Sequence, residues 1–306
     1  AAITYETGHW ILGSSIVATA LAAFFATFAF LNTQIIRTRS EAQIGSVPDL
    51  ITQINRELAD VSSGNRKSSY VYLLDYAPAL GITYKEAYFN ELESTLAKLA
   101  KLKSVRVLAV FYTKEEVEKF HKSIGQDKQI ERIEALIDDM DKPNTQESAV
   151  WRARDVGPLH IVMTDTIAFQ YIVIPKGNQQ RSDASGFSSE DTHLLRFLSE
   201  TFEHSIRQAI TPRCKVDDET LTLDFAPQNN VDKVQFFFGT DANINAETRA
   251  SYDEEQDWPE DARVEIPLDK VGDNKYLKIV LVKKNGMESP PSNSVKIFPD
   301  EDVNGG

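Results

Sequence analysis

The sequence predicts one transmembrane helix, an α/β sandwich and a C-terminal all-β sandwich. An uncharged apolar stretch predicts the first, alternating strand-like and helical runs predict the second, and short alternating strands predict the third. A chain of 306 residues has room for all three, because a domain uses about 100–150 residues. The expected parts are an N-terminal segment (1–9), the transmembrane helix (10–32), a juxtamembrane linker (33–47), the α/β domain (48–211), the β-sandwich (215–299) and a disordered tail (300–306).

The apolar stretch runs from Trp10 to Leu31 and contains no charged residue. At about 1.5 Å per helical residue it covers about 33 Å, which matches a hydrocarbon core of about 30 Å. It is longer than the apolar part of a secretory signal, about 7–15 residues, so we expect an uncleaved helix. Ala18, Ala22 and Ala26 repeat every four residues, and such a face predicts a possible homo-oligomer.

Charges on either side of this stretch predict its orientation. Arg37 and Arg39 follow it, whereas the residues before it include Glu6 and no lysine or arginine. The positive-inside rule then places the N-terminus outside and the C-terminal domains in the cytoplasm. The expected partners are therefore the lipid bilayer and other membrane or cytoplasmic proteins.

Composition argues against several other partners. Lys and Arg number 33 against 46 Asp and Glu, and the net charge of -13 repels polyanions, so no nucleic acid partner is expected. The scattered histidines lack metal-ligand spacing, and no P-loop or dinucleotide-binding glycine pattern is present. We therefore expect neither a metal nor a cofactor. The single cysteine, Cys214, cannot form an internal disulfide, which suits a reducing compartment.

The first soluble region alternates between strand-like and helical patterns. A short amphipathic helix near residues 49–58 opens it, and Ser188 with Asp191 three residues later predicts a capping box for its last helix. The pattern predicts strands at 70–74, 105–112, 159–164 and 169–174, and helices at 84–102, 114–124, 129–140 and 189–209. This alternation is typical of an α/β sandwich.

The loop after the first predicted strand is the predicted ligand pocket. Asp75 and Tyr76 lie there, at the carboxyl end of a buried strand, where open α/β sheets place ligands. Arg152 and Arg154 precede the strand that holds His160 and can add positive charge to the same site. A second interpretation remains open, in which Asp75 only caps a turn and the arginines are ordinary solvated charges.

Three features of this region together resemble one repeat of the phospholipase D-like fold: the phrase YVYLLDY, His160 on a strand with Asp165 at its turn, and the closing GFSSEDTHLLRFLSETFE. The catalytic motif of that family is H-x-K-x4-D, in which the histidine attacks phosphorus. Here Val162 stands where the lysine belongs, and Asp165 falls two positions early. The resemblance implies a degenerate, non-catalytic relative, because the phosphate charge lacks its cation. His160 and Asp165 are the candidate catalytic residues if any activity is retained.

The second soluble region is predicted to be all-β. Strand-like runs at 221–225, 234–238, 263–266 and 276–282 are separated by turn residues, which is typical of a sandwich. Asn285-Gly286 predicts a hairpin turn after the last run. The phrase YLKIVLVKKNGMESPPSNSVKIF resembles the last two strands of a fibronectin type III-like domain. That resemblance is structural and names no ligand.

The leading functional hypothesis is a membrane-anchored, non-enzymatic scaffold or sensor in a membrane-associated assembly, which binds partners through its soluble domains. One alternative is a membrane-bound phosphodiesterase or nuclease that uses His160, supported by Arg152 or Arg154. Another is a surface-displayed adhesion protein, which requires the opposite orientation in the membrane. Enzymatic activity is therefore left open, with a non-enzymatic role preferred.

Overall fold

The computed structural model describes residues 43–44, 47–75, 86–123, 130–142, 148–154, 160–175, 182–217, 219–244, 246 and 253–298. Its contacts divide the chain into two units, Ala1–Gln43 and Ile44–Gly306. The architecture below is that of the second unit.

The predicted fold class needs correction. None of the helices in the described ranges is both long and apolar enough to cross a membrane, so the transmembrane element is not supported. The predicted helix at 10–32, the alanines of its proposed oligomer face and the flanking arginines lie outside the described residues. What the described residues form is a mixed α/β structure with several sheets. We therefore carry forward neither the transmembrane helix nor the lipid bilayer as a partner.

A seven-stranded mixed sheet organises the first part of this unit, in the order β1-β7-β6-β5-β2-β3-β4. Strands β2, β3 and β4 are parallel, whereas β5 runs antiparallel to β2, and β6 and β7 continue in antiparallel fashion. Leu74 pairs with Ile161, so the end of β2 and the start of β5 share one edge of the sheet. The strands are β1 (Gln43–Ile44), β2 (Tyr70–Leu74), β3 (Arg106–Tyr112), β4 (Ser148–Ala153), β5 (His160–Thr164), β6 (Ala168–Pro175) and β7 (Ser182–Ser189).

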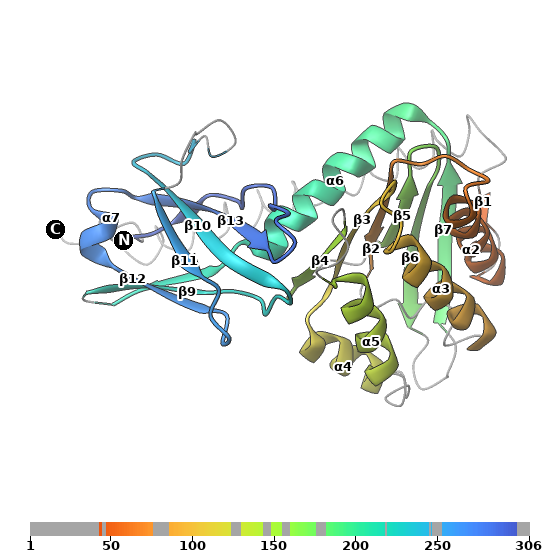
Figure 1. The fold of residues 1–306 in the computed structure, drawn as a ribbon, viewed down its shortest axis with the longest axis horizontal. Coiled ribbons are helices and arrows are strands. Elements are labelled where there is room, and N and C mark those ends of the chain that lie inside the picture. The colour runs from red at the N-terminus through yellow and green to blue at the C-terminus, as the bar shows by residue number, and fades with distance from the viewer. Residues whose placement is uncertain are drawn as a thin grey trace, which may run out of the picture. The chain divides into compact units, whose positions relative to one another are not determined.

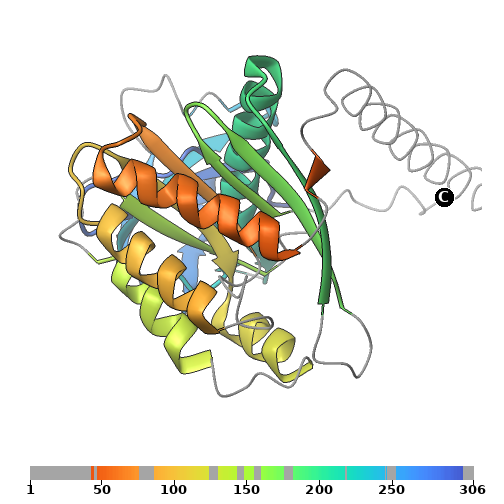
Figure 2. The same ribbon diagram turned by 90° about the vertical axis from the view of Figure 1, so that its right-hand side faces the viewer.

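Helices cover both faces of this sheet (Figures 1 and 2). The helices are α2 (Val47–Ser63), α3 (Glu86–Leu99), α4 (Lys114–Ser123), α5 (Ile130–Met140) and α6 (Thr192–Ile210). Side chains alternate between the two faces along β3. Val107, Ala109 and Phe111 pack with α2, α3 and α5, while Leu108 and Val110 pack on the side of α6. Burial on both faces explains why the strand reads as a nearly continuous apolar run.

The cap of α6 differs from the predicted one. Asp191 itself caps the helix, because its side chain accepts hydrogen bonds from the amides of His193 and Leu194 at 2.9 and 3.1 Å. A carboxylate in this position satisfies amide groups that have no partner within the helix. The capping box with Ser188 as its first residue is therefore wrong, and Ser188 belongs to β7.

The second part of the unit contains two further sheets. One has four strands in the order β11-β10-β13-β14, and the other has three in the order β12-β9-β8. The elements are β8 (Arg213–Val216), β9 (Thr220–Asp224), β10 (Val231–Gly239), β11 (Glu254–Asp257), β12 (Arg263–Pro267), α7 (Leu268–Val271), β13 (Tyr276–Lys283) and β14 (Val295–Lys296). Phe236 and Leu281 from the first sheet join Leu223 and Ile266 from the second in one apolar core.

That core continues from the β-sheets into the α6 side of the seven-stranded sheet. Trp151 of β4 and Phe202 of α6 belong to the same cluster of buried side chains as Phe236 and Leu281. A shared core means that the two parts exclude water from a common interior. The two parts of Ile44–Gly306 therefore form one body.

Two prolines prevent the segment that follows β13 from pairing with it as a regular strand. The segment beside it contains a proline pair at 290–291, which cannot donate ladder hydrogen bonds. The backbone amides of Ser289 and Ser292 bond to the carbonyls of Leu281 and Ile279, at 2.9 and 2.8 Å. In return the two serine hydroxyls accept hydrogen bonds from the amides of Leu281 and Ile279 at 3.0 Å. Serine side chains thus make hydrogen bonds with β13 that a regular neighbouring strand would otherwise make.

Candidate functional site

Three polar side chains meet at the edge of the large sheet where β2 ends. Nδ1 of His160 lies 2.7 Å from Oδ1 of Asp75, and the hydroxyl of Tyr171 donates to Oδ2 of Asp75 at 3.0 Å. The rings of His160 and Tyr171 stack with their centroids 4.8 Å apart. The structure therefore brings two sequence-predicted residues, Asp75 and His160, into one network. Tyr76 lies outside the described residues.

This network is almost completely buried. The exposed fractions are 9% for Asp75, 3% for His160 and 1% for Tyr171. Burial raises the pKa of Tyr171 well above its ordinary value, and the nearby charge of Asp75 raises it further. The phenol therefore stays protonated and serves as a hydrogen-bond donor. Asp75 receives a donor on each oxygen, an arrangement that orients the imidazole as a carboxylate does in acid–base sites.

Sequence reasoning missed Tyr171 as a member of this network. A signal for it exists in the hairpin of β5 and β6, where His160 pairs directly with Tyr171. The amide of Thr164 bonds to the carbonyl of Ile167 at 2.9 Å and fixes the register of this hairpin. Side chains that are directly opposite in an antiparallel pair lie on the same face, so the register alone brings Tyr171 beside His160.

Asp165 lies at the other end of β5, away from this network. Its Oδ2 accepts hydrogen bonds from the amide and the hydroxyl of Ser69, at 2.8 and 2.7 Å. These bonds tie the turn after β5 to the start of β2. The structure does not bring Asp165 to His160, so the two candidate catalytic residues do not form one site.

The two arginines that were candidates for ligand binding are held by other groups. Arg152 is 3% exposed; it forms a two-pronged ion pair with Glu134 at 2.7 and 3.2 Å and donates to the carbonyl of Tyr112 at 2.9 Å. Arg154 donates to the carbonyl of Phe225 at 2.6 Å and to the Asp224 carboxylate at 3.0 Å. Paired guanidinium groups of this kind fix geometry. Arg154 thereby links β4 to the second part of the body.

A buried lysine makes a polar link between the two parts. Lys283, at the end of β13, is 2% exposed and places Nζ 2.9 and 3.1 Å from the oxygens of Asp141. The same Nζ donates to the carbonyls of Val150 and Asn229 at 2.7 and 2.6 Å, and lies 4.7 Å from the centre of the Trp151 ring. We call this group of contacts the buried joint.

Burial disfavours the charged forms of both Asp141 and Lys283 in the buried joint. Loss of water raises the pKa of Asp141 and lowers the pKa of Lys283, although each partner counteracts the shift of the other. Desolvation of two ions is therefore the larger effect here. Beside them Gln228 pairs with the backbone of Arg152, accepting from its amide at 2.9 Å and donating to its carbonyl at 2.7 Å. Gln228 thus closes the outer edge of β4.

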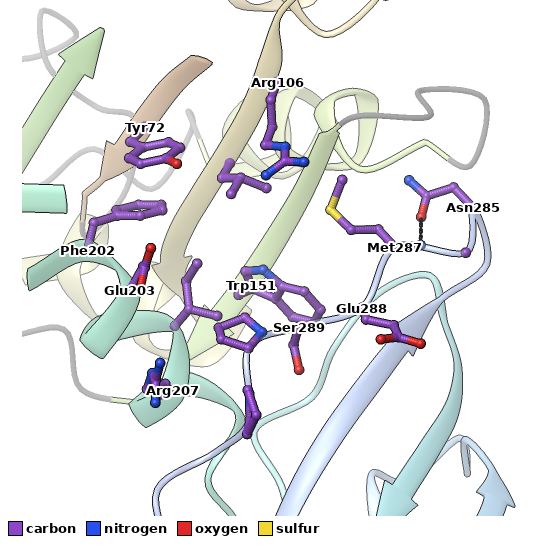
Figure 3. A pocket seen from close by; sticks show the side chains of 15 residues that line it. Tyr72, Arg106, Trp151, Phe202, Glu203, Arg207, Asn285, Met287, Glu288 and Ser289 are labelled. Carbon is purple, nitrogen blue, oxygen red and sulfur yellow. Dashed lines mark hydrogen bonds between the residues drawn. The ribbon is translucent and has the colours of Figure 1, made fainter. Parts of the chain in front are cut away.

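A cleft of about 730 Å³ lies next to the buried joint (Figure 3). Its floor comes from three strands of the large sheet, one wall from α6 and the other wall from the turn after β13. The lining residues are Tyr72, Arg106, Leu108, Trp151, Phe202, Glu203, Ile206, Arg207 and 285–291. Gly286 in the turn has φ 83°, a conformation that glycine adopts easily. The sequence holds no local signal for this cleft, because its walls are far apart along the chain.

The described residues contain no group of three histidine, cysteine, aspartate or glutamate side chains that are placed to hold a metal ion.

Comparisons with known proteins leave the family open. No family model matches the chain, and no curated protein matches it. Among solved structures the chain is similar to TrmBL2, an archaeal chromatin protein whose structure is described as showing a novel mode of DNA binding, with a TM-score of 0.32 and 9% identity. The match covers 62% of this chain and 62% of that one. A similarity this low carries no argument about fold or function.

Two sequence-based expectations are corrected. The exclusion of nucleic acid depended on net charge alone, which is a property of the whole chain and does not describe any one surface, so we withdraw that exclusion. None of the described helices could span a membrane, so the membrane label is not carried forward. The two family resemblances themselves stay predictions.

Proposed function

We propose that this chain is a non-enzymatic scaffold or sensor component that binds its partners through the body of residues 44–298. The observation that carries this proposal is the buried joint. Lys283 and Asp141 unite the large sheet with the β-sheets, so groups from both parts can present one binding surface. A surface that is ordered before binding loses less entropy when a partner arrives.

The contacts that Arg152 and Arg154 make also favour a binding function over phosphoryl transfer. A phosphodiesterase needs positive charge beside its attacking group, because the transition state accumulates negative charge on phosphate oxygens. Arg152 is instead paired with Glu134, and Arg154 donates to Asp224 and to the carbonyl of Phe225. Their role is to hold the body together.

Crosslinking and affinity capture test the proposal. The full chain, carrying an affinity tag, is expressed in its source cells, crosslinked and purified, and copurifying proteins are quantified by mass spectrometry. We expect a partner, or further copies of the chain, in amounts comparable with the tagged protein and absent when the tag alone is expressed. Recovery of the chain by itself would contradict a scaffold role.

One observation favours a second candidate, a hydrolase that uses His160. The distance of 2.7 Å between His160 and Asp75 suits an oriented general base. Purified chain is therefore incubated with bis(p-nitrophenyl) phosphate, beside His160→Ala and Asp75→Asn. Hydrolysis that both substitutions abolish, in variants that still show a cooperative thermal transition, would replace the scaffold proposal with this one. Activity that is absent, or equal in all three proteins, eliminates the hydrolase.

A further inference from the structure

We infer that the cleft between α6 and the turn after β13 binds a polypeptide segment of a partner in which lysine or arginine stands beside an apolar side chain. This inference deepens the proposed function and rests on it, since it names the class of partner and where it docks. Three properties of the cleft support it: its residue types, the sign of its unmatched charge and the way its aromatic rings are arranged.

The residue types are those that protein interfaces favour. Tyrosine, tryptophan, phenylalanine, methionine and arginine are enriched where one protein contacts another and supply most binding hot spots. All five types line the cleft: Tyr72, Met287 and two arginines have exposed surface, whereas Trp151 and Phe202 are buried at its base. Its volume of about 730 Å³ is sufficient for several side chains of a bound segment.

The unmatched charge of the cleft is negative. Glu203 on α6 and Glu288 in the turn are exposed on opposite walls, as Figure 3 shows, and within the described residues neither forms an ion pair. Arg106 and Arg207, by contrast, already take part in interactions. A cationic side chain entering the cleft thus meets two carboxylates that form no ion pair with any residue of the described ranges. The net charge of -13 attracts such a segment from a distance as well.

The floor offers an apolar seat between those charges. Tyr72, Leu108 and Met287 are half-buried and pack against the core, so each leaves part of an apolar surface toward the cleft. An apolar side chain of the partner would cover this surface while neighbouring lysines or arginines reach the two walls. Segments that combine both kinds of side chain therefore fit the cleft best.

The aromatic rings argue against single-stranded nucleic acid as the occupant. Bases bind by stacking on free ring faces. Here Tyr72 stacks on Phe202, with centroids 4.6 Å apart, and on Tyr70, with centroids 4.3 Å apart. The partly exposed aromatic ring of the cleft is therefore already stacked on two other rings.

Charge reversal supplies the test. The probes are three fluorescein-labelled twelve-residue peptides that share Leu and Phe at alternate positions and carry Lys, Gln or Glu between them. Fluorescence anisotropy measures their binding to the full chain and to the double variant Glu203→Lys with Glu288→Lys. We expect the full chain to bind the Lys peptide at least about fivefold more tightly than the Gln peptide. The double variant should instead prefer the Glu peptide.

A matched control changes the same amount of charge elsewhere. Glu200 and Glu219 are exposed and do not line the cleft, so Glu200→Lys with Glu219→Lys should keep the preference for the Lys peptide. Equal binding of the Lys peptide by the two double variants would overturn the inference, as would displacement of that peptide by a twelve-nucleotide oligothymidylate. If the peptide assay fails but affinity capture still recovers a partner, the proposed scaffold function remains supported. Absence of any captured partner contradicts the proposed function separately.

Discussion

The Asp75 network and the buried joint both place polar groups inside the body, but they satisfy them differently. In the network a single carboxylate accepts from His160 and Tyr171, and each of its oxygens has one donor. In the joint, a full positive charge and a full negative charge are enclosed together. The first arrangement matches donors with acceptors. The second also has to compensate for two desolvated ions.

This difference shows that a buried polar contact can fix how two parts dock without adding much to the free energy of unfolding. The pKa shifts of Lys283 and Asp141 both disfavour the charged forms, so the pair contributes little net stability compared with apolar side chains of the same size. What the pair provides is a defined docking geometry, because Lys283 Nζ contacts the Asp141 carboxylate and the carbonyls of Val150 and Asn229 at the same time. We infer that the joint specifies how the two parts meet.

Removal of one partner of the joint should have the largest effect. Lys283→Met leaves the Asp141 carboxylate buried beside no cation, and such a loss lowers the free energy of unfolding by about 3–5 kcal/mol. Urea unfolding followed by circular dichroism measures it. Lys284→Met, at the exposed neighbour, is the matched control and should be close to neutral. A change below about 1 kcal/mol in Lys283→Met would show that the joint is not desolvated.

Loss of a donor in the Asp75 network should have a smaller effect. Tyr171→Phe keeps the ring that stacks on His160 but removes the hydroxyl that donates to Asp75. One buried carboxylate oxygen then loses its donor, which lowers the free energy of unfolding by about 1–3 kcal/mol. The same urea titration reports it, with Tyr276→Phe as the control because Tyr276 is only half-buried. An unchanged unfolding midpoint would mean that this oxygen of Asp75 accepts a hydrogen bond from water in the variant.

The same tyrosine predicts an alkaline loss of stability. Tyr171 has a raised pKa in the folded protein, whereas the unfolded chain ionises it near about 10. Above that pH the folded state holds one proton more, so stability falls as pH rises, by about 1.4 kcal/mol per pH unit for one group. Urea midpoints between pH 9 and 11 should decline less steeply in Tyr171→Phe. A residual slope is expected, since burial also raises the pKa of Tyr70 and Tyr72. Identical slopes would exclude Tyr171 as a source.

Sequence patterns predicted the elements with strong periodicity and missed those without it. The run at 70–74 was predicted as a strand and is β2, because a short apolar run between polar residues is typical of a buried strand. β7 was missed, since its sequence SDASGFSS is rich in serine and has weak strand propensity. β4 was missed as well, because its arginine interrupts the apolar pattern and becomes buried only through Glu134.

Contacts within the polar sites were harder to predict from the sequence than the secondary structure. Asp75 and His160 were recognised separately as site candidates, but their contact joins residues 85 positions apart. The contact between Asp141 and Lys283 joins residues 142 positions apart, although alternation along β13 places Lys283 on the same face as the buried Ile279 and Leu281. Long-range polar pairs follow from the packing of whole elements. Single-sequence periodicity therefore indicates which of two adjacent lysines faces the core, but it carries no information about which carboxylate that lysine meets there.

Replacement of both ions should have the smallest effect and would separate the two interpretations of the joint. In Asp141→Asn with Lys283→Met the asparagine oxygen can still accept from the amide of Val150, now 2.9 Å from Asp141, and no charge remains buried. We expect unfolding only about 1 kcal/mol easier than in the wild type, despite two substitutions. A loss equal to that of Lys283→Met alone would show that the lysine stabilises through its carbonyl contacts. The peptide assay would then report whether the cleft beside the joint keeps its shape, because the uncharged joint no longer imposes a single arrangement of β13 on β4.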